Sequence, residues 1–240
     1  IQEHAAVAIR TICVHDEGAK KVIAEGVNAQ NKVEMVREGG LPYFFIALLR
    51  SSIERAQEHA CILLQNLSME KGNQIKIARE GDLPPPIALL RSPSEIVRQH
   101  AAAARQNLSV NPENELTIVQ EGAMSVLIAS MATGDHTLRS HVMTVLRNVT
   151  LHAENKVKFV REGGMPPLIG LLRHIDVRVQ EEAAVVLRNL SVSVQSKVRI
   201  VKEGGLAPLV ELLQSDDHKV VEHVCVVLRN LSANSDNERK

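Results

Sequence analysis

Residues 187–191 read Leu-Arg-Asn-Leu-Ser, and the pattern Asn-apolar-Ser/Thr within them occurs five times in the chain. The copies begin at Asn66, Asn107, Asn148, Asn189 and Asn230, so the interval from each copy to the next is constant. A fixed period of this kind is typical of a repeat protein, in which each unit buries its apolar face against its neighbours. The sequence therefore predicts a row of similar units.

Glycine and proline divide each unit into three helices. Glycine just past a helix favours the left-handed cap that ends it, and proline is tolerated in a helix's first turn. The first helices are predicted to end at Gly39-Gly40, Gly81, Gly122, Gly163-Gly164 and Gly204-Gly205, and the second to begin near Pro42, Pro84, Pro166 and Pro208. The third helix is the longest and ends at Asn-x-Ser/Thr, with capping boxes predicted at Ser51…Glu54 and Ser92…Glu95.

The Gly-Gly corner, the Pro and Leu-Leu after it and the closing Leu-Arg-Asn-Leu-Ser together resemble the armadillo repeat of β-catenin-like and Vac8-like proteins. The resemblance implies an all-α fold, a right-handed α-solenoid (superhelix) of three-helix repeats. The predicted repeats are 29–69, 70–110, 111–151, 152–192 and 193–233, and residues 234–240 begin a further repeat or form a tail.

The first residues depart from the period. Thr11 stands where the pattern requires Asn, and the interval from Thr11 to Asn66 is longer than the constant interval of the later copies. Residues 1–28 are therefore either a truncated repeat or a diverged terminal cap, and both interpretations stay open. The chain also begins within a helical pattern, which indicates a piece of a longer protein.

Composition narrows the function classes. The 28 Lys and Arg balance the 28 Asp and Glu, so no net field favours nucleic acid. No apolar stretch is long enough to insert into a membrane. Three cysteines form no disulfide framework, which indicates a cytoplasmic or nuclear protein. For this reason the Asn-x-Ser/Thr pattern is interpreted as part of the repeat and not as a glycosylation signal.

Turning the third helix by 100° per residue from its Asn sorts its positions onto two arcs. Positions −9, −6, −5, −2 and +1 form the apolar core arc; in the last unit they are Val221, Val224, Cys225, Leu228 and Leu231, and Cys61 lies on the same arc. Positions −8, −7, −4, −1 and 0 form the opposite arc. In stacked units this arc is predicted to line a continuous groove on the inner face.

The candidate binding residues lie in columns of this groove. Position 0 is the asparagine, a side chain that can both donate to and accept from a peptide backbone. Position −7 is His59, His100, His141, Glu182 and His223, with His4 in the irregular first unit. Position −1 is Gln65, Gln106, Arg147, Arg188 and Arg229.

These columns predict a protein-binding scaffold. The resemblance implies that the groove holds an extended peptide segment, as in armadillo proteins such as importin-α and β-catenin. Alternatively, the asparagines bond local backbone and shape the turn to the next unit. The arginines at −1 favour a partner segment of acidic or mixed charge.

Two other functions remain alternatives. An importin-α-like transport adaptor is disfavoured because position −4 is never Trp; it is Ile62, Ala103, Thr144, Val185 or Val226. A structural assembly module would form homo-oligomers through open repeat ends.

Catalysis is not expected, because the sequence has neither a phosphate loop nor a nucleophile pattern. No cofactor is expected either. The histidines stand on different helices about 10 Å apart, too far to share a metal ion.

Overall fold

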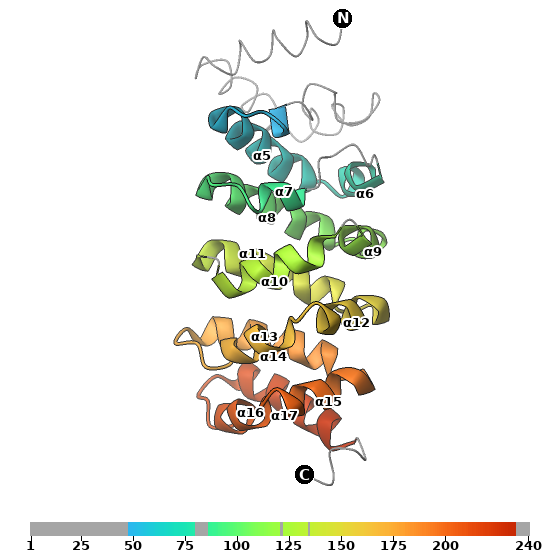
Figure 1. Ribbon diagram of the computed structural model, residues 1–240, viewed down its shortest axis with the longest axis vertical. Helices are drawn as coiled ribbons and strands as arrows, with labels where there is room; N and C mark the ends of the chain where they lie inside the picture. Colours follow the sequence, from blue (N-terminus) through green and yellow to red (C-terminus); the bar gives the residue numbers. More distant parts are fainter. Residues whose placement is uncertain (1–47, 80–85, 121, 134, 234–240) are drawn as a thin grey trace, which may run out of the picture. The chain divides into compact units, whose positions relative to one another are not determined.

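The computed structural model describes residues 48–79, 86–120, 122–133 and 135–233, and the regular elements among them are all helices (Figure 1). The all-α fold class is therefore confirmed for the described residues. The chain divides into two compact units, Ile1–Glu121 and Gly122–Lys240. The predictions for residues 1–28 and 234–240, for His4 and for the corners at Gly39-Gly40 and Gly81 lie outside the described residues.

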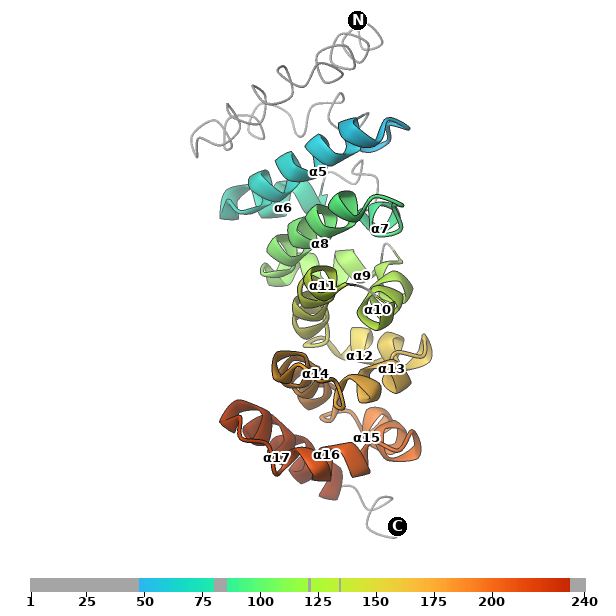
Figure 2. The ribbon, with the colours of Figure 1, turned by 90° about the vertical axis from the view of Figure 1, so that its left-hand side faces the viewer.

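The first unit is arranged around two third helices, α5 (Glu54–Ser68) and α8 (Glu95–Ser109), which pack against each other (Figure 2). The first helices α6 (Lys71–Arg79) and α9 (Pro112–Gln120) contact each other, and each also packs on α8. The short α7 (Pro86–Leu89) packs against α8 as well.

In the second unit three third helices follow one another, with α14 packed between α11 and α17 (Figures 1 and 2). These three are α11 (His136–Val149), α14 (Val177–Leu190) and α17 (His218–Ser232). The first helices are α12 (Ala153–Arg161) and α15 (Val194–Lys202), and the second helices are α10 (Ala123–Thr133), α13 (Met165–Leu171) and α16 (Leu206–Leu212). Each second helix contacts the third helix of the same repeat.

The Gly-Gly corner has two separate physical causes. Gly163 has φ +79°, a left-handed conformation that glycine adopts without strain. Gly164 has ordinary dihedral angles, but a Cβ there would lie 2.5 Å from the ring of Phe159. The first glycine therefore turns the chain, and the second lets two helices approach closely. Gly122 and Gly204 share the positive φ, which confirms the predicted corners at these positions.

The predicted capping boxes are wrong. The N-cap of α8 is Ser94, whose Oγ accepts from the backbone N–H of Val97 at 3.5 Å. Ser92 lies two residues earlier, and its Oγ accepts instead from the N–H of Ser94. Ser51 does the same with Ile53 before α5. A serine that closes such a local turn is not available to cap the helix. In the second unit, aspartates cap the third helices: Asp135, Asp176 and Asp217.

The core arc of the third helices is confirmed in part. Cys61 at position −5 of α5 is fully buried, as are Met143 and Ala184 at the same position of α11 and α14. Cys225 at −5 of α17 is exposed, contrary to the prediction. Position −5 is buried where another third helix packs onto it, and no described helix follows α17. The two cysteines therefore differ because position −5 faces the next repeat.

Candidate functional site

The five asparagines at position 0 are all half-buried, and hydrogen bonds to the preceding third helix fix the amides of several of them. Asn107 Nδ2 donates to Gln65 O at 3.2 Å and to Ser68 Oγ at 3.0 Å. Asn189 Nδ2 donates to Arg147 O at 2.9 Å and to Thr150 Oγ1 at 3.4 Å. We call this arrangement the asparagine ladder.

The ladder explains why the hydroxyl residue recurs with the asparagine. Ser191 Oγ donates to Arg188 O of its own helix at 2.8 Å and accepts from Asn230 Nδ2 at 2.9 Å. Ser68 combines the same two roles in the first unit. The pattern at Asn189 therefore supplies a donor toward the preceding repeat and, through Ser191, an acceptor toward the following one.

The ladder hydrogen bonds also determine which atoms of the asparagine amides remain available to a ligand. In Asn107 and Asn189 the structural bonds do not go to the local backbone of the same helix, as the alternative interpretation expected, but to the third helix of the preceding repeat. Only the NH₂ group can pair with a carbonyl, which fixes the orientation of both amides. The Oδ1 atoms of these two residues accept no hydrogen bond from the described part of the chain. The amide thus offers an acceptor to a ligand, whereas its donors are occupied.

Positions −7 and −1 meet across neighbouring repeats. His100 Nδ1 lies 2.6 Å from Gln65 Oε1, and because an amide oxygen only accepts, the imidazole donates. His223 Nδ1 lies 3.2 Å from Arg188 Nη1, and here the guanidinium donates and the imidazole accepts. Burial lowers the pKa of both histidines, and Arg188 lowers that of His223 further.

The other members of the −7 column have different partners. His59 Nδ1 is 2.8 Å from Arg55 O, one turn earlier in its own helix. Glu182 accepts from Ser140 Oγ at 3.0 Å. Burial raises the pKa of Glu182, and the hydrogen bond from Ser140 partly opposes this shift. His141 and Asn148 are half-buried and engaged in contacts of their own.

A pocket of about 240 Å³ opens between α11 and α14. Its walls combine both charges with apolar side chains, so it fits a side chain with an apolar stem and a polar end. The lining residues are Met143, Thr144, Arg147, Arg178, Glu181, Glu182 and Val185.

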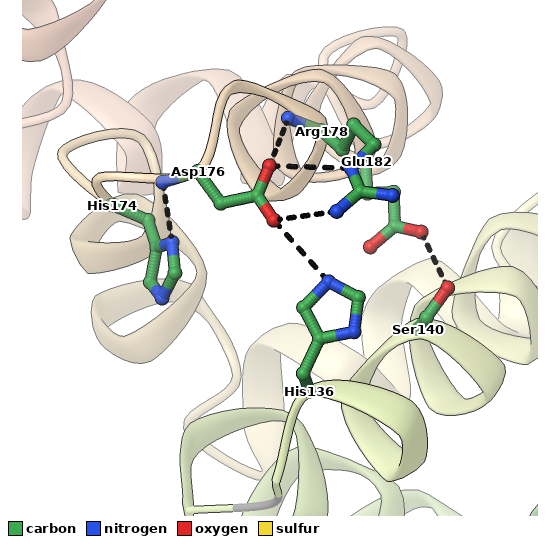
Figure 3. A network of polar contacts seen from close by, with 6 residues as sticks. All are labelled: His136, Ser140, His174, Asp176, Arg178 and Glu182. Carbon is green, nitrogen blue, oxygen red and sulfur yellow. Dashed lines mark hydrogen bonds and ion pairs between the residues drawn. The ribbon is translucent and has the colours of Figure 1, made fainter.

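A polar network at the start of α14 borders this pocket (Figure 3). Asp176 caps α14, accepts from the backbone and guanidinium of Arg178, and lies 3.2 Å from His136 Nε2 of α11. The hydrogen bonds from Arg178 lower the pKa of Asp176 to about 2. These three residues precede the repeat's recognisable pattern, so the spacing of that pattern does not identify them. The aspartates that recur at the repeat interval, Asp135, Asp176 and Asp217, are the signal that could have found the cap.

The charges on the groove arc of α14 are separated along the helix. In α14, Glu181 and Glu182 stand near the start and Arg188 near the end, about 10 Å apart at 1.5 Å per residue. This order also suits the helix dipole. Position −4 of α14 lies between the two charges and is the apolar Val185, which is 9% exposed. The groove arc of α14 therefore presents acidic side chains before Val185 and a basic side chain after it.

Position −2 contains an exception. It belongs to the core arc and holds leucine in four of the five third helices, but in α8 it holds Arg105, which is 1% exposed. A charged side chain in the core is costly unless polar groups compensate it. Arg105 is not among the predicted site residues, although a comparison of position −2 between the repeats distinguishes it from the four leucines.

Other classes of site find no support among the described residues. No group of three or more His, Cys, Asp or Glu side chains within them could hold a metal ion. Over the same residues, no helix is both long enough and apolar enough to cross a bilayer. The buried thiol of Cys61 has its pKa raised to about 12 by burial, so it is a poor nucleophile.

Comparison with known proteins agrees with the repeat architecture. Residues 152–192 and 193–233 each match the family model described as Armadillo/beta-catenin-like repeat. A search of curated proteins finds no match.

Several solved structures share the fold. An engineered protein is 26% identical, with a TM-score of 0.79, and 90% of each chain is covered. A designed armadillo repeat protein in complex with the peptide (KR)4 is 20% identical, with a TM-score of 0.79 over 90% of this chain and 92% of that one. A structure of computationally designed armadillo repeat proteins for modular peptide recognition is 20% identical, with a TM-score of 0.82 and the same coverage.

Proposed function

We propose that this chain, an armadillo repeat protein, binds an extended segment of a partner protein across its third helices. The observation that carries the proposal is the asparagine ladder. It holds the amides of Asn107, Asn189 and Asn230 at position 0 of their third helices, and the Oδ1 atoms of Asn107 and Asn189 accept no hydrogen bond from the described residues. Backbone N–H groups of a bound segment would donate to these oxygens, whatever the side chains of the segment.

The spacing of the helices supports an extended ligand. Two residues of extended chain advance about 6.6–6.8 Å, and packed helices lie about 8–10 Å apart. One ladder amide for every two ligand residues is therefore feasible where the inner faces of the helices come slightly closer together than their axes.

The arginines at position −1 give the second unit a preference for acidic side chains. The guanidinium groups of Arg147 and Arg229 form no ion pair with any residue that the structure describes, so they can meet a ligand carboxylate. A hydrogen bond between two charged groups is about twice as strong as one between neutral groups. The preference is opposite to the basic peptide seen with the designed protein.

Fluorescence anisotropy with two labelled peptides tests this preference. One peptide alternates Glu and Ser over eight residues and the other alternates Lys and Ser. We expect tighter binding of the acidic peptide, and about a tenfold or greater loss of its affinity in the Arg147→Gln, Arg188→Gln double variant. The matched control is Arg161→Gln, Lys202→Gln, which removes the same charge from exposed positions of α12 and α15. If both double variants lose the same affinity for the acidic peptide, net charge alone explains the effect, and the role assigned to the arginines at position −1 is overturned.

The contribution of the ladder amides needs a separate control, because they also hold the repeats together. Asn189→Ala, Asn230→Ala removes both the amide oxygens and the ladder donors. Thr150→Val, Ser191→Ala removes ladder acceptors and leaves the amides in place. If the asparagines contact the ligand, only the first pair abolishes binding of the acidic peptide. Similar losses in both pairs would show that the ladder acts only through stability.

A second candidate function is self-association through the last repeat. The observation that favours it is the exposed apolar surface of the last helices: Cys225 on α17 is exposed, and Val210 and Leu213 at α16 are 55% and 39% exposed. Light scattering over a range of protein concentrations tests it. A mass that stays monomeric throughout would exclude this function.

A further inference from the structure

A row of exposed apolar side chains follows the asparagine ladder. Each member stands three residues after the asparagine at position 0, directly after the Ser or Thr of the pattern. The row consists of Met69, Val110, Leu151 and Val192, which are 60%, 61%, 59% and 65% exposed. Single exposed apolar residues are normal on protein surfaces. Exposure of this extent at the same position of four successive repeats is not scatter, and we call these four residues the apolar row.

Backbone hydrogen bonds hold the row beside the ladder. The N–H of Leu151 donates to the carbonyl of Asn148 at 3.1 Å, and the N–H of Val110 donates to that of Asn107 at 3.4 Å. Met69 and Val110 are the C-cap residues of α5 and α8, and Leu151 and Val192 directly follow the C-cap residues of α11 and α14. The row therefore lies at the carboxyl ends of the third helices.

In the second unit this row is paired with positive charge. Arg147 lies in the last turn of α11 and precedes Leu151 by four residues, and Arg188 lies in the last turn of α14 and precedes Val192 by four. Along the chain, the arginine therefore stands before the asparagine at position 0 and the apolar residue after it. A ligand bound at the ladder would meet a cation on one side and an aliphatic surface on the other.

The successive side chains of an extended peptide point in opposite directions. Side chains on one side of such a peptide can therefore meet the arginines, and those on the other side can meet the apolar row. We propose that the second unit recognises an extended partner segment in which acidic and aliphatic side chains alternate. The acidic side chains pair with Arg147 and Arg188, and the aliphatic side chains cover Leu151 and Val192. The inference rests on the proposed function, since it assumes a segment held by the ladder asparagines, and it adds the ligand's sequence pattern.

The first unit provides a natural contrast. Met69 and Val110 are exposed to the same extent, but position −1 there is Gln65 or Gln106. Without the guanidinium groups, α5 and α8 can favour the aliphatic half of the pattern but not the acidic half. The acidic preference is thereby assigned to the helices after Gly122.

Peptide binding measured by fluorescence anisotropy with the full chain tests the pattern. The probes are eight-residue peptides that alternate Glu with Leu, Glu with Ser, and Lys with Leu. A fourth peptide has four Glu followed by four Leu. We expect the Glu/Leu alternation to bind about tenfold more tightly than the Glu/Ser alternation, from burial of the aliphatic side chains. It should also bind more tightly than the Lys/Leu and the blocked peptides.

The decisive variant is Leu151→Ser, Val192→Ser. It should remove the advantage of the Glu/Leu peptide over the Glu/Ser peptide and leave the affinity for Glu/Ser unchanged. The matched control is Val157→Ser, Val198→Ser, which changes two exposed valines on the first helices α12 and α15, 44% and 38% exposed. The control should keep the full advantage.

The outcomes separate the two proposals. If Glu/Leu and Glu/Ser bind equally well, and Arg147→Gln, Arg188→Gln weakens both, the inference is overturned while the proposed function stands. If no peptide binds, both are overturned. Equal binding of the blocked peptide would overturn the alternation. A change of oligomeric state in Leu151→Ser, Val192→Ser, with unchanged peptide binding, would assign the row to contacts between copies and also overturn the inference.

Discussion

The third helices of the two units have the same ladder but present different chemistry beside it. In the first unit, Asn107 donates to the carbonyl of Gln65 and to Ser68; in the second, Asn189 donates to the carbonyl of Arg147 and to Thr150. The backbone carbonyl at position −1 serves the ladder in both units, so the side chain at −1 is free to differ. It is Gln in the first unit and Arg in the second.

That one difference inverts a hydrogen bond. Gln65 accepts from His100, whereas Arg188 donates to His223, although the paired positions are the same. Two adjacent positions therefore have different roles: the asparagine at position 0 is constant and joins the repeats, whereas the side chain at position −1 varies between the units. The hydroxyl residue two positions after the asparagine accepts the hydrogen bond that joins the repeats, and the residue at position −1 sets the local charge.

The largest expected effect comes from exchanging the residues at core position −2. Leu187→Arg places a charge where leucine is fully buried, and we expect it to lower the free energy of unfolding by about 3–5 kcal/mol. The reverse exchange, Arg105→Leu, should be neutral or stabilise by about 1–3 kcal/mol, because it gives α8 the residue of the other repeats. Denaturant unfolding followed by circular dichroism measures both. Strong destabilisation by Arg105→Leu would mean that the arginine anchors a polar network specific to the first unit.

The two cysteines at position −5 should differ by about a hundredfold or more in reactivity. At pH 8, a thiol of pKa about 12 is thiolate in only about one molecule in ten thousand, and Cys61 is also inaccessible. Cys225 is exposed. Reaction of the native Cys13→Ser variant with a maleimide, followed by peptide mass mapping, measures the ratio. Comparable rates would contradict the conclusion that position −5 of α5 is covered by the next repeat.

A smaller effect is expected at a buried asparagine of the first helices. Asn73, Asn114 and Asn155 donate to carbonyls at the ends of the preceding third helices, whereas Ser196 takes this place in α15. The Ser196 hydroxyl is buried without a hydrogen-bond partner among the described residues. We expect Ser196→Asn to raise the free energy of unfolding by about 1 kcal/mol, and Asn155→Ser to lower it by about 1–2 kcal/mol. Both free energies come from denaturant unfolding. If both substitutions destabilise, the asparagine site does not fit in α15.

The smallest expected effect is on the titration of His223. Its pKa is lowered by burial and by Arg188, so the folded state binds fewer protons than the unfolded state below pH about 6.5. This contribution to stability is complete above that pH and is lost as the pH falls toward the pKa of the folded state. Arg188→Gln should raise the pKa of His223, because it removes the nearby cation and supplies an acceptor like that of Gln65. NMR titration of the His223 ring measures the shift, and an unchanged pKa would show that Arg188 does not contribute to it.

Much of the fold could be predicted, because the constant repeat period is visible in the sequence and the glycine corners act locally. Gly163 shows this, since a positive φ is a requirement of its own backbone. The candidate site was less predictable. The asparagine column was found from spacing, but the carbonyl that accepts from Asn107 belongs to the preceding repeat, and only packing brings the two together. The capping-box prediction at Ser92 was wrong because Ser92 and Ser94 are both suitable N-cap residues for α8, and residue spacing alone does not show which of them caps the helix.

The sequence by itself determined the all-α class, the positions of the repeated asparagines and the residue types around them, because these follow from periodicity and short-range chemistry. Only the tertiary structure decided what each residue does. It assigned the amide donors to the ladder, gave Cys61 and Cys225 opposite exposure, and left the residues after the ladder open to solvent. The physical reason is that burial and hydrogen bonding depend on the neighbouring helix, and a residue's place in its own repeat does not reveal what that neighbour covers.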